Sequence, residues 1–332
     1  MAISTIGIIG GGAWGTALAI MAQTAGLDTI IWAREAEVAQ AINQSHENTV
    51  FLPGVKLNPT INATNDLSQA AAQHALLVVT PAQHTRAILQ DLKPLLRPGT
   101  LVAMCSKGIE QGTHKFMSQV LAETLPSAEP AILSGPSFAA EVARNLPTAV
   151  TLAGKTLEAV EPLAEALKGP TFRPYLSDDM IGAQIGGAVK NVLAIACGIV
   201  EGRKLGVSAK AALMTRGFAE IIRLGRVLGA KPETLRGLSG LGDLILTCSS
   251  SLSRNMSLGL ALGEGQTLDQ ILNARQSVTE GVHTAGVVIE IANTHNIDMP
   301  ICESVHMITS QGADIDQTIS DLLNRPLRTE DD

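Results

Sequence analysis

The sequence predicts an α/β domain, in which helices cover both faces of a parallel sheet, followed by an all-helical domain. Short β-branched runs alternate with helical patterns through the first half of the chain, as is typical of parallel sheets. Strand signals stop at about Ile181, and only helical patterns follow. The length of 332 residues suits two domains at roughly 100–200 residues each. We therefore expect a first domain at residues 1–178 and a second at residues 179–332.

The elements of the first domain follow from these patterns in order. The expected strands are Thr5–Ile9, Thr29–Trp32, Leu76–Thr80, Thr100–Cys105, Ala131–Leu133 and Ala149–Leu152. The expected helices are Thr16–Thr24, Glu35–Asn43, Thr85–Leu92, Lys115–Glu123 and Leu157–Leu167. For the second domain we expect helices at Ala183–Val200, Ala209–Leu228, Asn255–Leu262, Leu268–Asn273, Thr284–Asn293 and Ile301–Thr309.

Composition narrows the classes of function. Only 2% of the residues are aromatic and the net charge is −7, without a basic run, so we expect no nucleic-acid partner. The four cysteines are far apart and match no metal-ligand spacing, so we expect buried, reduced thiols and no metal site. The apolar N-terminus contains several glycines and no preceding Lys or Arg, which argues against a secretion signal or a membrane span. We expect a soluble cytoplasmic protein.

A glycine-rich turn joins the first strand to the first helix. Gly10-Gly11-Gly12-Ala13-Trp14-Gly15 has the form G-x-G-x-x-G, in which glycines allow a tight turn and close approach of a pyrophosphate to a helix N-terminus. The alternative is a glycine-rich turn in some other α/β protein, but the position after a first strand favours a Rossmann dinucleotide site. Arg34, after the second strand, favours NADP or tolerance of both cofactors, although the adjacent Glu35 leaves the choice open.

Two lysines are candidates for chemistry. Lys107 follows a strand at the sheet edge where ligands bind, although it could be an ordinary solvated loop lysine. Lys190 interrupts an uncharged helical stretch that contains Gly186 and Gly187 one turn earlier. It must extend to solvent, pair with an acid or act as a proton donor with a lowered pKa. Asp243, in a glycine-rich loop, is its candidate partner or else a helix N-cap.

Further polar segments suit an anionic substrate. The segment Thr247–Asn255 brings hydroxyls, Arg254 and Asn255 to the start of a helix, which suits a phosphate dianion, although Ser253 could simply be the helix cap. The loop Ser134–Phe138 follows another strand and can face the same sheet edge. Glu280 precedes a helix, and its spacing leaves its role undetermined.

Taken together, these motifs closely resemble bacterial NAD(P)-dependent glycerol-3-phosphate dehydrogenases. The motifs that carry the resemblance span nearly the whole chain: the Gly10–Ala17 turn, Ser106-Lys107-Gly108, Ser134-Gly135-Pro136-Ser137, Lys190-Asn191, Leu241-Gly242-Asp243 and Ser253-Arg254-Asn255. The resemblance implies reversible reduction of dihydroxyacetone phosphate to sn-glycerol 3-phosphate, a precursor for phospholipid synthesis. It also implies a Rossmann domain followed by a helical domain similar to that of 6-phosphogluconate dehydrogenase, and it suggests a homodimer.

The resemblance also implies a role for each matching residue. Lys190 would be the general acid or base, with its pKa lowered by the nearby Lys107. The substrate would contact Lys107, Gly135, Ser137, Lys190, Asp243, Ser253, Arg254 and Asn255. The cofactor, NADP or NAD with a weak preference for NADPH, would contact Gly10, Gly12, Ala13, Trp14, Gly15, Arg34, Lys107, Ala139, Arg254, Val278 and Glu280.

Two other functions compete with this one. A relative that oxidises a small 3-hydroxy acid would hold a carboxylate in place of the phosphate, but Arg254 and Asn255 at a serine-rich helix start favour phosphate. A regulatory protein that senses NAD(P)H without turnover would have no need for Lys190 within an apolar helix.

Overall fold

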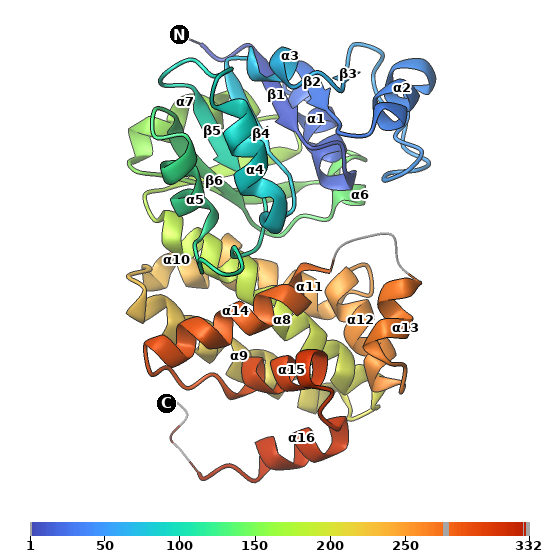
Figure 1. Ribbon diagram of the computed structural model, residues 1–332, viewed down its shortest axis with the longest axis vertical. Helices are drawn as coiled ribbons and strands as arrows, with labels where there is room; N and C mark the ends of the chain where they lie inside the picture. The colour runs from blue at the N-terminus through green and yellow to red at the C-terminus, as the bar shows by residue number, and fades with distance from the viewer. Residues whose placement is uncertain (1, 275–278, 328, 330–332) are drawn as a thin grey trace. The chain divides into compact units, whose positions relative to one another are not determined.

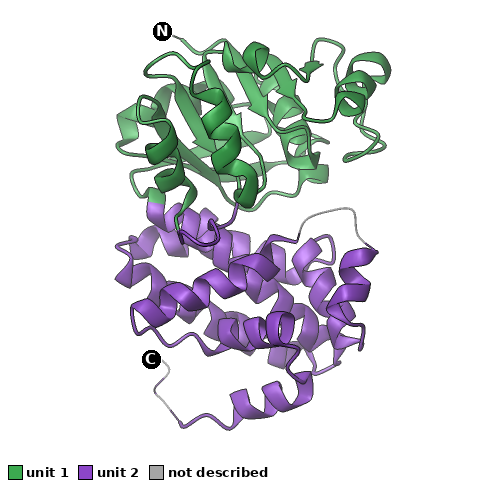
Figure 2. Ribbon diagram, in the orientation of Figure 1, with its two compact units in different colours: residues 1–106, 115–180 green, residues 107–114, 181–332 purple. Residues whose placement is uncertain are grey.

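The computed structural model describes residues 2–274, 279–327 and 329. The chain divides into two compact units, which Figure 2 shows in green and purple. Unit 1 comprises Met1–Ser106 and Lys115–Met180, and unit 2 comprises Lys107–His114 and Ile181–Asp332. The segment 107–114 is therefore part of the helical unit by its contacts, although it follows a strand of the α/β unit in sequence.

Unit 1 is built on an eight-stranded sheet with the order β3-β2-β1-β4-β5-β6-β7-β8 (Figure 1). The strands are β1 (Thr5–Ile9), β2 (Asp28–Trp32), β3 (Asn62–Thr64), β4 (Ala75–Val78), β5 (Leu101–Met104), β6 (Glu129–Ser134), β7 (Thr148–Gly154) and β8 (Phe172–Ser177). All six expected strands are confirmed, and β3 and β8 were missed. Both missed strands lie at edges of the sheet, where β3 is short and polar and β8 contains Pro174.

The expectation of a parallel sheet is wrong for one pair of strands. β6 and β7 run antiparallel, while the other neighbouring strands of the sheet pair in parallel. The connection between them contains only α6 (Ala139–Val142). A helix of four residues spans about 6 Å, which is too short to run back along a strand of about 20 Å. The chain therefore enters β7 from the edge at which β6 ends.

The remaining helices of unit 1 pack against this sheet. They are α1 (Ala13–Thr24), α2 (Ala36–Ser45), α3 (Leu67–Ala71), α4 (Ala82–Leu92), α5 (Met117–Thr124) and α7 (Leu157–Leu167). α1 packs beside α6, and α4 packs beside α5 (Figure 1). The core between α1 and the sheet is aliphatic, with fully buried Ile6, Ile8 and Ile31. Because the sequence has few aromatic residues, the core consists mainly of aliphatic side chains.

Unit 2 is helical, as expected. Its helices are α8 (Met180–Gly202), α9 (Val207–Val227), α10 (Pro232–Arg236), α11 (Asp243–Ser249), α12 (Arg254–Gly263), α13 (Leu268–Asn273), α14 (Glu280–Thr294), α15 (Pro300–Gln311) and α16 (Ile315–Leu323). A π-helical turn, η1 (Leu238–Gly242), precedes α11. The short elements α10, η1, α11 and α16 were missed, although α16 has an amphipathic pattern with apolar residues at Ile315, Ile319, Leu322 and Leu323.

The helix α8 is the core of unit 2. Among the described residues it is the one helix long and apolar enough to cross a membrane, and the whole of its apolar window is buried within the protein. All four cysteines are buried and outside any disulfide, as expected, and Cys197 lies on this helix.

Candidate active site

The glycine-rich turn lies at the carboxyl end of β1, where the strand order reverses between β1 and β4. Ligands of open α/β sheets bind at this kind of switch point. Gly10 has a φ of 131°, a backbone conformation that residues other than glycine rarely adopt. A Cβ on Gly15 would lie 1.9 Å from the Gly10 carbonyl oxygen, so the turn can close only with glycine there. The sequence interpretation of this turn is thus supported by its backbone.

The first turn of α1 is open to an anion. Gly12 is its N-cap and makes no side-chain capping bond, and the first turn contains no acidic residue. A Cβ on Gly12 would meet nothing within 4 Å, so there is space in front of the helix N-terminus. Free N–H groups, the helix dipole and open space together suit a pyrophosphate.

Buried polar atoms surround the same edge of the sheet. Within the described residues, Trp14 Nε1, Ser106 Oγ and Ser134 Oγ are buried and have no hydrogen-bond partner. Trp14 belongs to the glycine-rich turn, and the two serines lie at the ends of β5 and β6. Buried polar groups are nearly always satisfied, so these atoms fit a site that binds a polar molecule. Unit 1 therefore fits a dinucleotide cofactor.

Asn48, which the sequence did not indicate as a site residue, forms hydrogen bonds to the glycine-rich turn. This fully buried side chain donates to the Gly11 carbonyl and to Thr16 Oγ1, each over 2.8 Å. Thr16 Oγ1 in turn donates to the Gly12 carbonyl over 2.9 Å. A lone Asn far along the chain gives no sequence signal for such a contact, because only tertiary packing brings it to the turn.

The other predicted residues of unit 1 occupy loops at strand ends. Arg34 follows β2, is 73% exposed and pairs with Glu35 over 2.9 Å. Gly135 follows β6 with a φ of 148°, and a Cβ there would lie 2.9 Å from Val150 Cα. Ser137 Oγ donates to the Gly135 carbonyl over 3.0 Å, and Ala139 begins α6. Because β1, β4, β5 and β6 are mutually parallel, their carboxyl ends lie at one edge of the sheet.

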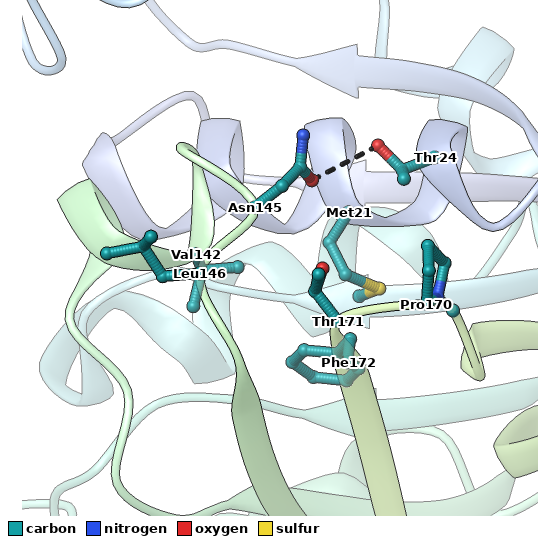
Figure 3. Close-up of a pocket in the computed structure, with 9 residues that line it drawn as sticks. Met21, Thr24, Val142, Asn145, Leu146, Pro170, Thr171 and Phe172 are labelled. Atoms are coloured by element: carbon teal, nitrogen blue, oxygen red, sulfur yellow. Dashed lines mark hydrogen bonds between the residues drawn. The ribbon is translucent and has the colours of Figure 1, made fainter.

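A small pocket in unit 1 lies elsewhere. It is lined by Met21, Thr24, Val142, Asn145, Leu146, Gly169, Pro170, Thr171 and Phe172 (Figure 3). Thr24 Oγ1 donates to Asn145 Oδ1 over 3.3 Å, and no ionisable side chain lines the pocket. Thr24 ends α1, whose twelve residues span about 18 Å from the glycine-rich turn. This pocket is therefore not the candidate active site.

The charged residues of unit 2 form a buried cluster. Lys190 Nζ, on α8, donates to Asp243 Oδ1 over 2.5 Å, and Lys107 Nζ donates to Asp243 Oδ2 over 2.8 Å. The exposed fractions of these side chains are 7% for Lys190, 1% for Asp243 and 16% for Lys107. Lys190 thus pairs with an acid, and Lys107 is not a solvated loop lysine. We call Lys107, Lys190 and Asp243 the lysine–aspartate cluster.

Burial is the main influence on the proton of Lys190. The pKa of Lys190 is lowered to about 8 by all influences together, and burial contributes most because a buried ammonium loses its hydration. The Asp243 carboxylate partly offsets this effect, and the Lys107 ammonium lowers the pKa further. Lys107, expected to be the cause of this lowering, has a smaller effect than burial. An amine with this pKa can gain or lose a proton near neutral pH.

Two neighbours of the cluster were missed as site residues. Thr247 Oγ1 accepts a hydrogen bond from Lys190 Nζ over 2.8 Å. Asn191 Nδ2 donates to the Lys107 carbonyl over 3.1 Å, which holds segment 107–114 against α8. The spacing of Asp243 and Thr247 by four residues could have indicated that they share a helix face. Asp243 was expected in a loop, but it is the first residue of α11.

The serine-rich segment forms the N-terminus of α12. Ser253 is its N-cap and accepts a hydrogen bond from Met256 N over 3.2 Å, so the helix-cap interpretation of this serine is confirmed. Arg254 is the first helical residue. Asn255 Nδ2 donates to Asn191 Oδ1 and its Oδ1 accepts from Gly281 N, both over 3.0 Å. The amide of Asn255 therefore joins α12 to α8 and α14.

Two predicted residues remain, Val278 and Glu280, and the second belongs to α14. Glu280 is its first residue. Val278 lies outside the described residues. The structure thus brings Lys107, Lys190 and Asp243 into contact, and it links Asn255 to them through Asn191.

Comparison with known proteins identifies the family. Models of the N-terminus and C-terminus of NAD-dependent glycerol-3-phosphate dehydrogenase match residues 5–160 and 179–320. A glycerol-3-phosphate dehydrogenase [NAD(P)+] of Parvibaculum lavamentivorans is 58% identical over 330 residues, covering 99% of both chains. That of Hyphomonas neptunium is 56% identical over 326 residues, covering 98% of this chain and 97% of the relative.

Solved structures agree with this family. A crystal structure of glycerol-3-phosphate dehydrogenase from Coxiella burnetii has a TM-score of 0.93 at 40% identity, covering 97% of this chain and 99% of that one. A ketopantoate reductase from Ralstonia eutropha shares only the fold, with a TM-score of 0.56 and 16% identity over 95% of this chain and 99% of that one. The glycine-rich turn, the lysine–aspartate cluster and these matches show that the chain belongs to the NAD-dependent glycerol-3-phosphate dehydrogenase family.

Proposed function

We propose that this protein reversibly reduces dihydroxyacetone phosphate to sn-glycerol 3-phosphate with NAD(P)H, and that Lys190 exchanges the proton. The observation that carries the proposal is the lysine–aspartate cluster, in which a buried lysine has a pKa of about 8 and two polar neighbours that orient it. Membership of the family supports the substrate and the reaction, since the relatives carry the name of this activity.

The chemistry of the cluster suits reduction of a ketone. A bound NAD(P)H supplies the hydride, and negative charge then develops on the carbonyl oxygen of the substrate. The Lys190 ammonium stabilises this charge and donates a proton to the oxygen. Asp243 and Thr247 hold Nζ in place through hydrogen bonds of 2.5 and 2.8 Å. Lys107 adds positive charge to the same buried region, which favours an anionic transition state.

The substrate phosphate binds at the N-terminus of α12. Arg254 supplies a planar guanidinium, and the first turn of the helix supplies N–H groups and a positive dipole end. Binding the phosphate, which does not react, orients the carbonyl. Ser253 and Asn255 contribute to this site while they also cap α12 and join it to α8. Gly135 and Ser137 of unit 1 complete the substrate contacts.

The cofactor binds to unit 1 along the glycine-rich turn. Its contacts are Gly10, Gly12, Ala13, Trp14, Gly15, Arg34 and Ala139, with Lys107, Arg254, Val278 and Glu280. Arg34 follows β2, where a guanidinium suits the 2′-phosphate of NADP, so NADPH is weakly preferred. The pair with Glu35 partly neutralises this arginine, so NADH is also accepted. The enzyme acts in the cytoplasm as a homodimer and supplies a precursor for phospholipid synthesis.

The test is the oxidation of NADPH and NADH with dihydroxyacetone phosphate, beside a small 3-keto acid as competing substrate. We expect Lys190→Ala to lower turnover by about 10²–10⁴-fold, the usual contribution of general acid catalysis. Cofactor binding, followed by fluorescence titration, should be retained. Lys155→Ala, at a lysine that is 58% exposed on unit 1, is the matched control and should keep full activity. Wild-type turnover by Lys190→Ala, or reduction of the keto acid alone, would contradict the proposal.

A further inference from the structure

The helix α8 contacts the turn before Asp243 through backbone atoms. A Cβ on Gly186 would lie 2.4 Å from the Ser239 carbonyl oxygen and 2.6 Å from Gly240 Cα. Both atoms belong to η1, which leads directly into Asp243. On its other side, a Cβ on Gly240 would lie 1.9 Å from the Leu235 carbonyl oxygen. The turn therefore packs closely against α8 and α10 through backbone atoms.

A second glycine contact holds α12 against α8. A Cβ on Gly259, of α12, would lie 2.0 Å from the Ile195 carbonyl oxygen of α8. In the other direction, a Cβ on Gly198 would lie 2.2 Å from the Met256 carbonyl oxygen. These contacts are again to backbone, so rotation of a side chain cannot relieve an added methyl group. Arg254 lies five positions before Gly259 on the same helix.

These glycines stand where other residues would form better helices. Glycine weakens a helix interior because it has the most backbone freedom to lose, whereas alanine is favourable there. Gly186 lies one turn before Lys190 on α8. Gly186 contacts η1, which precedes Asp243, and Lys190 donates a hydrogen bond to Asp243 itself. The close approach thus places an aspartate and a lysine from different helices within hydrogen-bond distance.

We propose that Gly186 and Gly259 are positioning residues for the reaction, Gly186 setting the distance from Asp243 to Lys190 and Gly259 setting the place of Arg254. The inference rests on the proposed function of Lys190 and Arg254. Proton exchange would then depend on the contact of Gly186 with η1, and phosphate binding on the contact of Gly259 with α8.

An added methyl group at each position has a separate consequence. The groups that face Lys190 are Asp243, Thr247 and Cys248 from α11 and Lys107 from segment 107–114. At Gly186 the methyl group pushes η1, and with it Asp243, away from Lys190. The ammonium then loses its carboxylate partner, so its pKa falls. At Gly259 the methyl group displaces α12, and with it Arg254, while Lys190 on α8 and Asp243 on α11 keep their hydrogen bond.

The experiment compares Gly186→Ala, Gly259→Ala and Gly286→Ala in the full-length protein. Gly286 lies within α14, and a Cβ there would meet only the His306 ring at 3.4 Å, so this variant controls for the change in helix propensity. Each variant is assayed for the pH profile of kcat/KM with dihydroxyacetone phosphate, for KM, and for cofactor binding. Circular dichroism verifies the fold.

We expect Gly186→Ala to move the alkaline midpoint of the profile down by about one pH unit and to lower kcat roughly tenfold to a hundredfold. Gly259→Ala should raise KM for dihydroxyacetone phosphate about tenfold, as for the weakening of a charge-assisted hydrogen bond, with the midpoint unchanged. Gly286→Ala should alter neither. Because wild-type turnover and the loss of turnover in Lys190→Ala are measured alongside, a failure of the proposed function is recognised separately.

Several outcomes would overturn the inference. If Gly186→Ala folds and keeps the wild-type midpoint, Gly186 does not position Asp243. If both variants change midpoint and KM alike, the two contacts do not act separately. If Gly186→Ala or Gly259→Ala fails to fold while Gly286→Ala folds, that glycine serves the stability of unit 2 and is not a positioning residue.

Discussion

Replacing Asp243 by asparagine tests the electrostatic reasoning about the lysine–aspartate cluster. Asparagine keeps the size and shape of the side chain but removes the negative charge that lies between Lys190 and Lys107. Burial and Lys107 both lower the pKa of Lys190, and only the carboxylate and smaller contributions raise it. The substitution therefore lowers the pKa of Lys190 further. In the proposed mechanism, reduction of the substrate needs the protonated lysine, so activity should be lost from the alkaline side.

The size of the effect follows from the position of the carboxylate. An opposite charge at hydrogen-bond distance typically shifts a pKa by about one to three units, and we take about two. With a starting pKa of about 8, the protonated share of Lys190 at pH 7 falls from roughly nine-tenths to one-tenth, about a tenfold loss. At pH 8 the loss from protonation alone is about fiftyfold, and at pH 5 it nearly disappears.

The assay is the initial rate of NADPH oxidation with dihydroxyacetone phosphate from pH 5 to pH 9, fitted for the midpoint of kcat/KM. Thr247→Val is the matched control, because it removes a neutral hydrogen-bond acceptor of Lys190 and leaves the charges in place. Its midpoint should move by less than about half a pH unit. If Asp243→Asn lowers kcat/KM by the same factor at every pH, the reasoning is refuted. The carboxylate would then affect the rate by some route other than the pKa of Lys190.

Two further substitutions test the recognition of the ligands. Arg254→Lys keeps the charge but not the bidentate geometry, so efficiency should fall about tenfold or more with dihydroxyacetone phosphate and far less with unphosphorylated dihydroxyacetone. Equal losses with both substrates at saturating cofactor would mean that Arg254 does not bind the phosphate. Arg34→Asp should shift the ratio of efficiencies from NADPH toward NADH, because a carboxylate repels the 2′-phosphate and accepts hydrogen bonds from the ribose. An unchanged ratio would show that Arg34 does not contact the 2′ position.

Local patterns of the sequence indicated several features of the candidate site. The G-x-G-x-x-G turn between a strand and a helix was recognised because its glycines lie within six residues of the chain. Lys190 was recognised because a charge within an apolar helix needs a partner, and Asp243 was named as that partner. Asn48 and the Asn191–Asn255 contact could not be predicted, since nothing along the sequence relates residues that only packing brings together.

Local patterns in the sequence predicted the α/β and helical halves, six of the eight strands of the sheet and the chemical types of the candidate site residues. These properties depend on apolar periods and on turns of a few residues, which are local. Tertiary structure decided the antiparallel direction of β7 and the attachment of segment 107–114 to the helical unit. It also decided which influence governs the proton of Lys190. Burial is a property of the whole fold, so only the packed structure shows that desolvation lowers its pKa more than Lys107 does.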